Sequence, residues 1–530
     1  MAVTPLRDLL AETTSFRLDQ PITRSISQSI SIVRSTISNW DPQSSHSPSF
    51  LQATSHLHSH LLRLSKSASH GAKSSRHSEL VKIHTLLESA MQHLEELFKR
   101  RLFSISSDVD LQRDEIADVR LIAETMLATG YGGECVSMYQ SMRQSNLKSQ
   151  MVRLGFDQYS NQPKIIKKHR WEVLDRHIKS WTDIAPVVIQ SFCSEEHRLC
   201  YEIFAASPES VRNSIFSTIT CDMALSFLTF PETVTVYLKP SPEKLFRLLD
   251  MYVVLSDLLP DIESMFGSDP ARSVRSQVMS SLDKLSKAIR SVVSEFELAI
   301  QKDPLKSSAV RGGAIHPLTR YVMNYLAYLS DFEDSLHEIL IDLPPDCKSS
   351  FFEQANLADG SILSVTIAWI LFVLLCKIDS KAETYSEAAS SYLFLANNLQ
   401  YIVKKIQGCR LKEILGDDLV NEHNTKARRF MDGHVRSAWA NMSALLPVHN
   451  EDDDMERLRK FEINFEKAMK ERKEWVIADA AMREEVRLTV EAMLVPVYRG
   501  WYRSHEDFVA VKFTPEDVKK RILRFYGDSD

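Results

Sequence analysis

Apolar residues recur at three- and four-residue steps through most of the chain, and this spacing limits the fold more than any other feature. Such steps place the apolar side chains on one face of an α-helix. The pattern runs from Val81 to Phe98 and again from Ile116 to Leu127. Gly130 follows the second stretch, and glycine suits the left-handed conformation that ends many helices. The spacing therefore predicts a succession of amphipathic helices.

Short breaks carrying Pro, Gly, Ser or Asp separate further periodic stretches. These stretches cover Trp171–Phe192, Glu243–Leu259, Ser273–Gln301, Leu318–Leu340 and Met455–Trp475. The main strand candidate, Val234–Leu238, is too isolated to build a sheet. Only 14 of 530 residues are glycine, which disfavours sheet-rich folds and phosphate-binding loops. We predict an all-α chain of stacked antiparallel helical bundles.

The first 80 residues differ in composition from the rest. Residues 21–80 contain 18 serines and six histidines, with few large apolar side chains to offset the entropy of ordering. We expect a partly flexible N-terminal region, 1–80, and a helical body, 81–530. His56, His58 and His60 alternate, but on a helix they do not share a face, so we predict no metal site there.

Charge and cysteine usage exclude several classes of protein. The net charge of −6 argues against a nucleic-acid partner. The seven cysteines are scattered without C-x-x-C pairs, so neither a zinc site nor a disulfide framework is predicted. The first residues lack an apolar signal core, and the apolar run Ile362–Cys376 is shorter than the roughly 20 residues of a membrane span. We expect a cytoplasmic protein with no cofactor and no catalytic residues.

A series of motifs resembles the seventy-kilodalton subunit family of the exocyst complex, in its plant-type, divergent form. The motifs occur in the order found in that family and cover roughly residues 110 to 530. They are Gly130–Cys135, Trp171–Trp181, Glu195–Phe204, Ser241–Tyr252, Leu258–Phe266, Gly312–Leu326, Ser390–Ile406, Arg483–Tyr502 and Val511–Ile522.

The resemblance implies an elongated rod of helical bundles that acts without catalysis. Members of the family help to tether secretory vesicles to the plasma membrane before fusion. The implied partners are other exocyst subunits, a small GTPase, and phosphatidylinositol bisphosphate with other anionic lipids. The implied location is the cytoplasm, with peripheral recruitment to the inner face of the plasma membrane. An adaptor that acts outside the exocyst, in defence or specialised membrane traffic, is the alternative.

The final bundle, from about 455 to 530, holds the candidate site. Thr514 and Pro515 suit the start of a helix whose apolar side carries Val518, Ile522, Phe525 and Tyr526. In the family, a basic surface near this end binds phosphoinositides; Lys512 matches a lysine of that motif, whereas Val509 replaces a neighbouring one. The predicted lipid-binding residues are Lys512, Lys519, Lys520, Arg521 and Arg524. The same cations could instead solvate one helix face.

A second basic cluster precedes Trp171 and could add membrane attraction, although simple solvation is the favoured interpretation. It comprises Lys164, Lys167, Lys168, His169 and Arg170. Two family motifs also have structural explanations. Asn397 and Asn398 suit hydrogen bonds within a helical core, and His316 suits a turn into a helix better than catalysis.

The remote enzyme alternative is an all-helical, magnesium-dependent prenyl-diphosphate enzyme. Asp452, Asp453 and Glu456 have the acidic D-D-x-x-E spacing that can hold magnesium. No second acidic motif accompanies them, and carboxylates at this place also favour the start of a helix. We therefore predict a protein that binds partners and catalyses no reaction.

Overall fold

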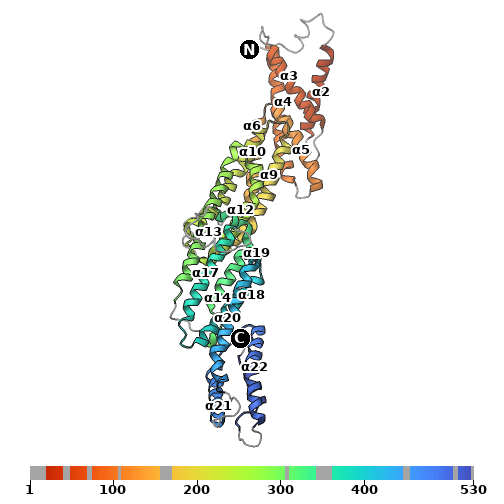
Figure 1. Cartoon of the computed structure of the whole chain (residues 1–530). Helices are drawn as coiled ribbons and strands as arrows, with labels where there is room; N and C mark the ends of the chain where they lie inside the picture. Colours follow the sequence, from red (N-terminus) through yellow and green to blue (C-terminus); the bar gives the residue numbers. More distant parts are fainter. Residues whose placement is uncertain are drawn as a thin grey trace. The chain divides into compact units, whose positions relative to one another are not determined.

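The structure, a computed structural model, describes residues 19–39, 48–67, 74–105, 109–155, 170–304, 310–341, 361–445, 454–504 and 511–526. Its described elements are helices, with no β-strand among them (Figure 1). The prediction of an all-α fold is confirmed. The strand candidate is helical, because Val234 to Tyr237 end helix α11.

The helices form two compact units. The N-terminal unit comprises Met1–Leu238 with Asp250–Leu285, and the C-terminal unit comprises Lys239–Leu249 with Ser286–Asp530. The first contains α2 (Asp19–Ser38), α3 (Pro48–Ser67), α4 (Ser74–Ser104), α5 (Val109–Ala128), α6 (Gly132–Arg153), α8 (Trp171–Pro186), a π-helix (Val187–Cys193), α9 (Ser194–Ile203), α10 (Glu209–Leu228) and α11 (Phe230–Tyr237). Helices α12 (Leu245–Phe266) and α13 (Arg272–Lys302) contribute residues to both units.

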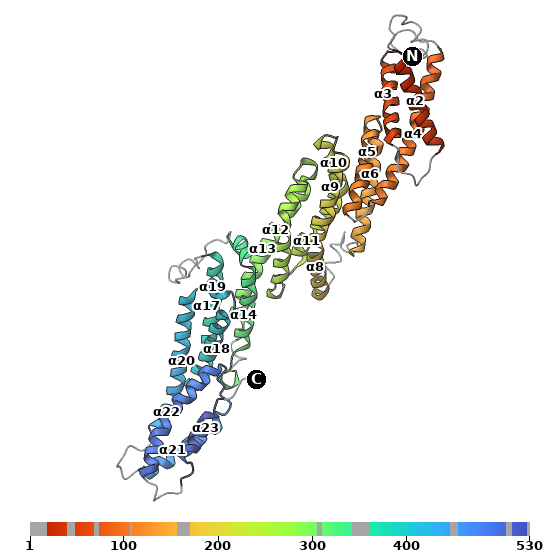
Figure 2. The same ribbon diagram turned by 90° about the vertical axis from the view of Figure 1, so that its right-hand side faces the viewer.

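Packed helices begin earlier than the composition predicted. Helices α2 and α3 lie within the serine-rich region and pack against each other and against α4 (Figure 2). Ile26 and Val33 of α2 are buried, as are Phe50 and Leu57 of α3. In each helix the two apolar residues are seven positions apart and therefore share a face. Packed helices are thus present upstream of Val81, while the division into a partly flexible region 1–80 and a helical body 81–530 stays a prediction.

A buried ion pair joins two helices of the N-terminal unit. Arg143 of α6 and Glu196 of α9 are both almost fully buried, and the guanidinium Nε and Nη2 donate to the carboxylate at 2.9 and 2.6 Å. Removing one partner from such a pair strands a buried charge. The pair therefore fixes how α6 and α9 face each other.

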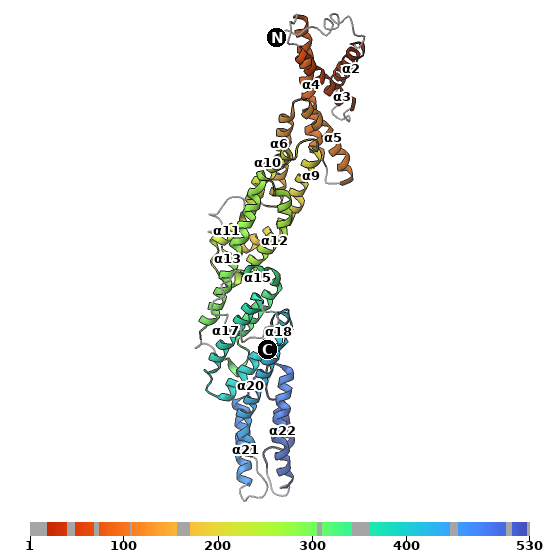
Figure 3. The ribbon, with the colours of Figure 1, turned by 45° about the horizontal axis from the view of Figure 1, so that its top comes forward.

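The C-terminal unit contains the remaining elements. They are α14 (Pro317–Leu329), α15 (Glu333–Leu340), α17 (Ile362–Ala382), α18 (Ala388–Gln407), α19 (Leu411–Leu415), α20 (Asp417–Ser443), α21 (Asp454–Glu471), α22 (Ala480–Ser504) and α23 (Pro515–Leu523). Three-residue 3₁₀ turns lie at Pro242–Lys244, Asp269–Ala271, Arg311–Gly313 and Ser330–Phe332 along the chain. Helices α21 and α22 extend side by side at one end of the C-terminal unit (Figure 3).

Helix α17 is longer than the sequence suggested. It has 21 residues and begins with the 15-residue apolar run Ile362–Cys376, so the length of the whole helix does not exclude a membrane span. By length and composition, Ile362–Ala382 and Glu209–Tyr237 are the two described stretches able to cross a membrane. In both, more than half of the most apolar window is buried inside the protein, as in the core helices of many globular proteins.

A polar junction of two asparagines joins three segments of the C-terminal unit. The Asn397 amide nitrogen donates to the carbonyls of Gly313 and Val476 at 2.8 and 2.7 Å, and its oxygen accepts from the Ala478 N–H at 3.0 Å. The side-chain oxygen of Asn398 accepts hydrogen bonds from the His316 N–H and the Thr319 hydroxyl, so the start of α14 is also held at this junction. The predicted structural role of both asparagines is confirmed.

His316 belongs to the same junction and begins α14. Its Nδ1 accepts from the N–H of Leu318 at 3.0 Å, so the ring caps the helix that starts at Pro317. Burial lowers the pKa of His316, and the charge of Lys381 lowers it further. The prediction of a turn entering a helix is confirmed.

Gly312 makes the junction possible because no other residue fits its place. Its φ is +68°, and a Cβ there would lie 1.9 Å from the carbonyl oxygen of Glu474. Gly312 also accepts a hydrogen bond from the N–H of Val476 at 3.0 Å. Close backbone approach and positive φ both require glycine here.

We expect Gly312→Ala to lower the free energy of unfolding by about 3 kcal/mol, since the methyl group must displace the Glu474 backbone. Urea unfolding followed by tryptophan fluorescence measures the change. Gly500→Ala is the matched control, because a Cβ at Gly500 meets open space within helix α22. A loss no larger than that of the control would contradict this account.

Candidate functional site

The C-terminal helix α23 is capped as the sequence predicted. The Thr514 hydroxyl accepts from the Asp517 N–H at 3.1 Å, and the Asp517 carboxylate accepts from the Thr514 N–H at 3.1 Å. Hydrogen bonds from Thr514 lower the pKa of Asp517. Pro515 occupies the first helical position, and Val518 and Ile522 are buried. The start and direction of α23 are thus fixed by local contacts.

The other end of α23 is anchored in the core by Tyr526. Its hydroxyl lies 2.9 Å from Nε2 of His434 and accepts from the indole N–H of Trp439 at 2.8 Å. Nδ1 of His434 lies 2.7 Å from the carbonyl of Ala389, an acceptor, so the proton sits on Nδ1 and Nε2 accepts from Tyr526. Burial lowers the pKa of His434 to about 4.

Arg487 of α22 completes the anchor. Its Nε and Nη2 donate to the carbonyls of Phe525 and Tyr526 at 2.8 and 2.9 Å. These carbonyls follow the end of α23, where a cation is electrostatically favoured. Tyr526 has a φ of +62°, which the surrounding contacts hold. Both ends of α23 are therefore held by hydrogen bonds, while the face of the helix that points away from the core is exposed to solvent.

Two of the five predicted lipid-binding cations are paired with carboxylates. Lys512 contacts Glu466 of α21, and this hydrogen bond lowers the pKa of Glu466. Lys519 lies 2.7 Å from Glu491 of α22. An ion pair within the protein reduces the charge that each lysine presents to an outside anion.

The other three predicted cations, Lys520, Arg521 and Arg524, are exposed. The Arg521 guanidinium lies over the ring of Phe513, 4.4 Å from its centroid, and this contact orients it. Residues 454–530 contain 16 basic and 16 acidic side chains, so the bundle as a whole has no net charge. Any attraction to an anionic surface would therefore depend on local segregation of charge, and these three exposed residues are called the outer cations.

Most of the remaining candidate residues lie beyond the part of the chain that the structure describes. Lys164, Lys167, Lys168 and His169 lie outside the described residues, as do Asp452 and Asp453; Arg170 directly precedes α8. Glu456 pairs with Lys460 on α21 at 2.9 Å. The part of the chain that the structure describes holds no group of three metal-ligating side chains.

Sequence reasoning missed the residues that modulate and support the site. Glu466 and Glu491 lie on α21 and α22, far along the chain from the lysines that they pair with. No local pattern marks them, because the pairing depends on how three helices pack. The apolar cluster Phe525–Tyr526 gave a partial signal for the anchor, but its partner His434 gave none.

Two family models match separate parts of the chain. The family model for the C-terminal part of the Exo70 exocyst complex subunit matches residues 179–524, and the model for the N-terminal part of the exocyst complex component Exo70 matches residues 12–103. The second match extends the family resemblance upstream of residue 110, into the serine-rich region.

Two similar sequences come from Arabidopsis thaliana. Exocyst complex component EXO70B1 is 30% identical over 430 residues, covering 78% of this chain and 66% of that protein. Exocyst complex component EXO70B2 is 30% identical over 430 residues, covering 79% of this chain and 70% of that protein. The match with EXO70B1 thus spans slightly less than two thirds of that relative.

The fold is shared with a solved structure from yeast. The crystal structure of the S. cerevisiae exocyst component Exo70p matches with a TM-score of 0.59 and 14% identity, over 95% of this chain and 99% of that chain. The likeness supports the fold of stacked helical bundles.

We expect the His434 anchor to make stability depend on pH. The folded-state pKa of about 4 lies below the ordinary value of 6.5, so between these pH values the unfolded chain binds a proton that the folded chain does not. Stability contributed by the neutral ring is present above pH 6.5 and lost as the pH falls towards 4, by up to about 3 kcal/mol.

Urea midpoints of the full chain between pH 7 and pH 4 measure this loss. The His434→Gln variant should be less stable at pH 7 and show a shallower decline with acid. His337→Gln is the control, because His337 is exposed on α15. Equal declines in wild type and His434→Gln would refute the assignment.

Proposed function

Because the chain belongs to the Exo70 family of exocyst subunits, we propose that it is a non-catalytic subunit that helps to tether secretory vesicles to the plasma membrane before fusion. In this role it contacts other exocyst subunits and a small GTPase through its helical surfaces. Its C-terminal end binds phosphatidylinositol bisphosphate and other anionic lipids. The protein is cytoplasmic and is recruited peripherally to the inner face of the membrane.

The observation that carries the lipid contact is the exposure of the outer cations on a rigidly held helix. Lys520 and Arg524 are one helical turn apart, and Arg521 is oriented by Phe513. Each basic residue near an anionic bilayer contributes about 1 kcal/mol. Three such residues give a modest affinity, so recruitment also needs the protein contacts that an exocyst subunit makes.

Lys512 and Lys519 contribute less than the outer cations. Both already contact carboxylates, Glu466 and Glu491, and a lipid phosphate would have to compete with these pairs. The five predicted residues therefore divide into three principal lipid contacts and two that mainly support the bundle.

Replacing Lys520, Arg521 and Arg524 together by glutamine should weaken binding to liposomes that contain phosphatidylinositol bisphosphate by about 3 kcal/mol, roughly a hundredfold in the partition coefficient. Flotation at low and physiological salt measures this change, and wild-type binding should fall as salt rises. The double variant Lys512→Gln, Lys519→Gln should lose less.

The matched control is the triple variant Arg428→Gln, Arg429→Gln, Arg436→Gln, which removes three exposed cations from α20. It carries the same change of net charge at another place and should float like wild type. If both triple variants lose binding equally, the attraction is not specific to α23. Unchanged flotation of the α23 variant would remove the outer cations from the proposal.

Affinity purification of the tagged full-length protein from its native cells, with mass spectrometry and a tag-only control, tests the exocyst role. Several other exocyst subunits should be recovered in comparable amounts, from wild type and from the α23 triple variant alike. Repeated absence of these subunits, with other partners recovered reproducibly, would favour the adaptor outside the exocyst.

A further inference from the structure

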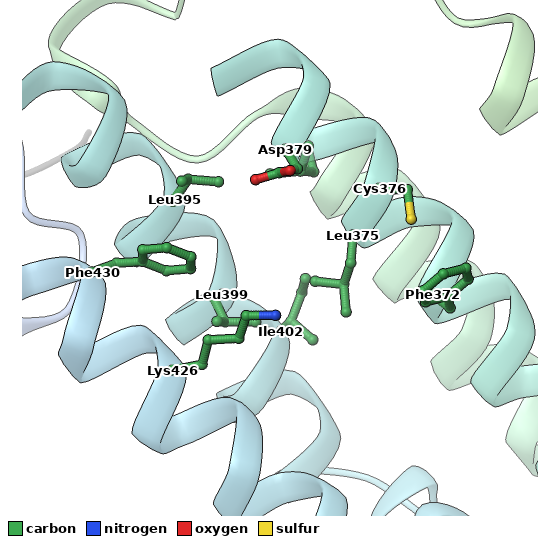
Figure 4. Close-up of a pocket in the computed structure, with 10 residues that line it drawn as sticks. Phe372, Leu375, Cys376, Asp379, Leu395, Leu399, Ile402, Lys426 and Phe430 are labelled. Atoms are coloured by element: carbon green, nitrogen blue, oxygen red, sulfur yellow. The ribbon is translucent and has the colours of Figure 1, made fainter. Parts of the chain in front are cut away.

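A small pocket opens between α17, α18 and α20 of the C-terminal unit and shares no residue with the basic surface. Leu399 and Ile402 of α18 form its buried floor, Leu375 of α17 lies opposite Phe430 of α20, and Phe372 of α17 lines the pocket farther from Phe430 (Figure 4). The cavity volume is about 190 Å³. Pockets that enclose whole cofactors are typically about 300 to 1,000 Å³, so this one suits a single side chain.

Helices α18 and α20 pack closely beside the pocket. Gly433 of α20 faces the ring of Tyr392, where a Cβ would lie 3.2 Å from the ring atoms. Ala427 of α20 is also buried. Small residues let two helices approach closely, so α17 and α20 stand as ridges on either side of α18. The result is a groove with a pocket in its floor.

The outer face of α17 along this groove is apolar, which is unusual for a surface helix. Phe372 is 41% exposed, Cys376 is exposed, and Trp369 is half-buried beside Phe372, with ring centroids 5.7 Å apart. These residues follow one another at steps of three and four and form a continuous stripe. An exposed apolar stripe beside a pocket marks an interaction site.

Opposite charges stand on the two ridges. Asp379 of α17 and Lys426 of α20 both line the pocket and are exposed (Figure 4). Among the described residues, neither forms an ion pair, with the other or with any third side chain. A ligand with a basic side chain on one flank and an acidic side chain on the other could form an ion pair with each of these residues.

We propose that this groove binds an amphipathic helix of a partner protein, which inserts one large apolar side chain between Leu375 of α17 and Phe430 of α20. The helix presents a basic residue to Asp379 and an acidic residue to Lys426. A helix lying in a groove places its anchor residues at steps of three, four and seven, which matches the pocket and the stripe. This interaction goes beyond the proposed lipid contact and does not depend on it.

Three stapled 18-residue helical peptides with the same apolar stripe test the proposal by fluorescence anisotropy with the full-length chain. One carries lysine on one flank and glutamate on the other, the second carries glutamate on both flanks, and the third carries lysine on both. The peptide with lysine on one flank and glutamate on the other can pair with both Asp379 and Lys426, whichever way its chain runs along the groove. It should bind at least about fivefold more tightly than the other two.

Two variants make the test specific. Asp379→Lys renders both ridges basic, so the peptide with two glutamate flanks should become the tightest ligand. Cys376→Trp places a large ring at the pocket and should weaken all three peptides at least about tenfold. Asp432→Lys is the matched control, because Asp432 is exposed on α20 and does not line the pocket; it should keep the wild-type order.

Equal binding of the three peptides, an order unchanged by Asp379→Lys, or no binding at all would overturn the proposal. Two further results would also overturn the proposal, because each would show that the groove has a different occupant. One is self-association of the chain in sedimentation that Cys376→Trp abolishes. The other is binding to phosphatidylcholine vesicles that the same substitution abolishes. Circular dichroism of each variant establishes that it is folded.

Discussion

The polar junction around Asn397 and Asn398 supports the C-terminal unit. Apolar helix faces attract one another without a fixed register, since burial of apolar area has no direction. Hydrogen bonds from two buried amides do have a direction, and each would leave a costly unpaired group if the register slipped. The junction fixes α18 against the entry to α14 and against the segment between α21 and α22. Gly312 lets these backbones approach closely enough.

The candidate surfaces depend on that register in different ways. Helix α23 is held at one end by its capping box and at the other by Tyr526, His434 and Arg487, so its exposed cations keep a constant spacing. The same packing brings Glu466 and Glu491 against Lys512 and Lys519. Packing thus holds the exposed cations in place, and it also lowers the net positive charge of the surface by pairing two lysines with carboxylates. The pocket beside α17 instead lies where α17, α18 and α20 meet.

The two surfaces also use different physics. The outer cations attract anions over a distance that salt shortens, and they carry little shape information. The groove would recognise a partner by shape and by burial of apolar area, and Asp379 and Lys426 would discriminate only weakly between partners of different charge. A protein with both could approach an anionic membrane and hold a partner helix through independent contacts.

The helical class, the capping of α23 and the packing role of the two asparagines follow from local signals in the sequence, namely helical spacing, the Thr514–Asp517 pair and two adjacent amides. The sequence also carried the family motifs. It did not determine the early start at α2, where seven-residue spacing was hidden by serine content, or the full length of α17. The ion pairs of Lys512 and Lys519, the anchor of Tyr526 and the groove beside α17 were decided by tertiary structure alone. Each depends on helices that are distant in sequence, and no local pattern records which side chains such helices bring together.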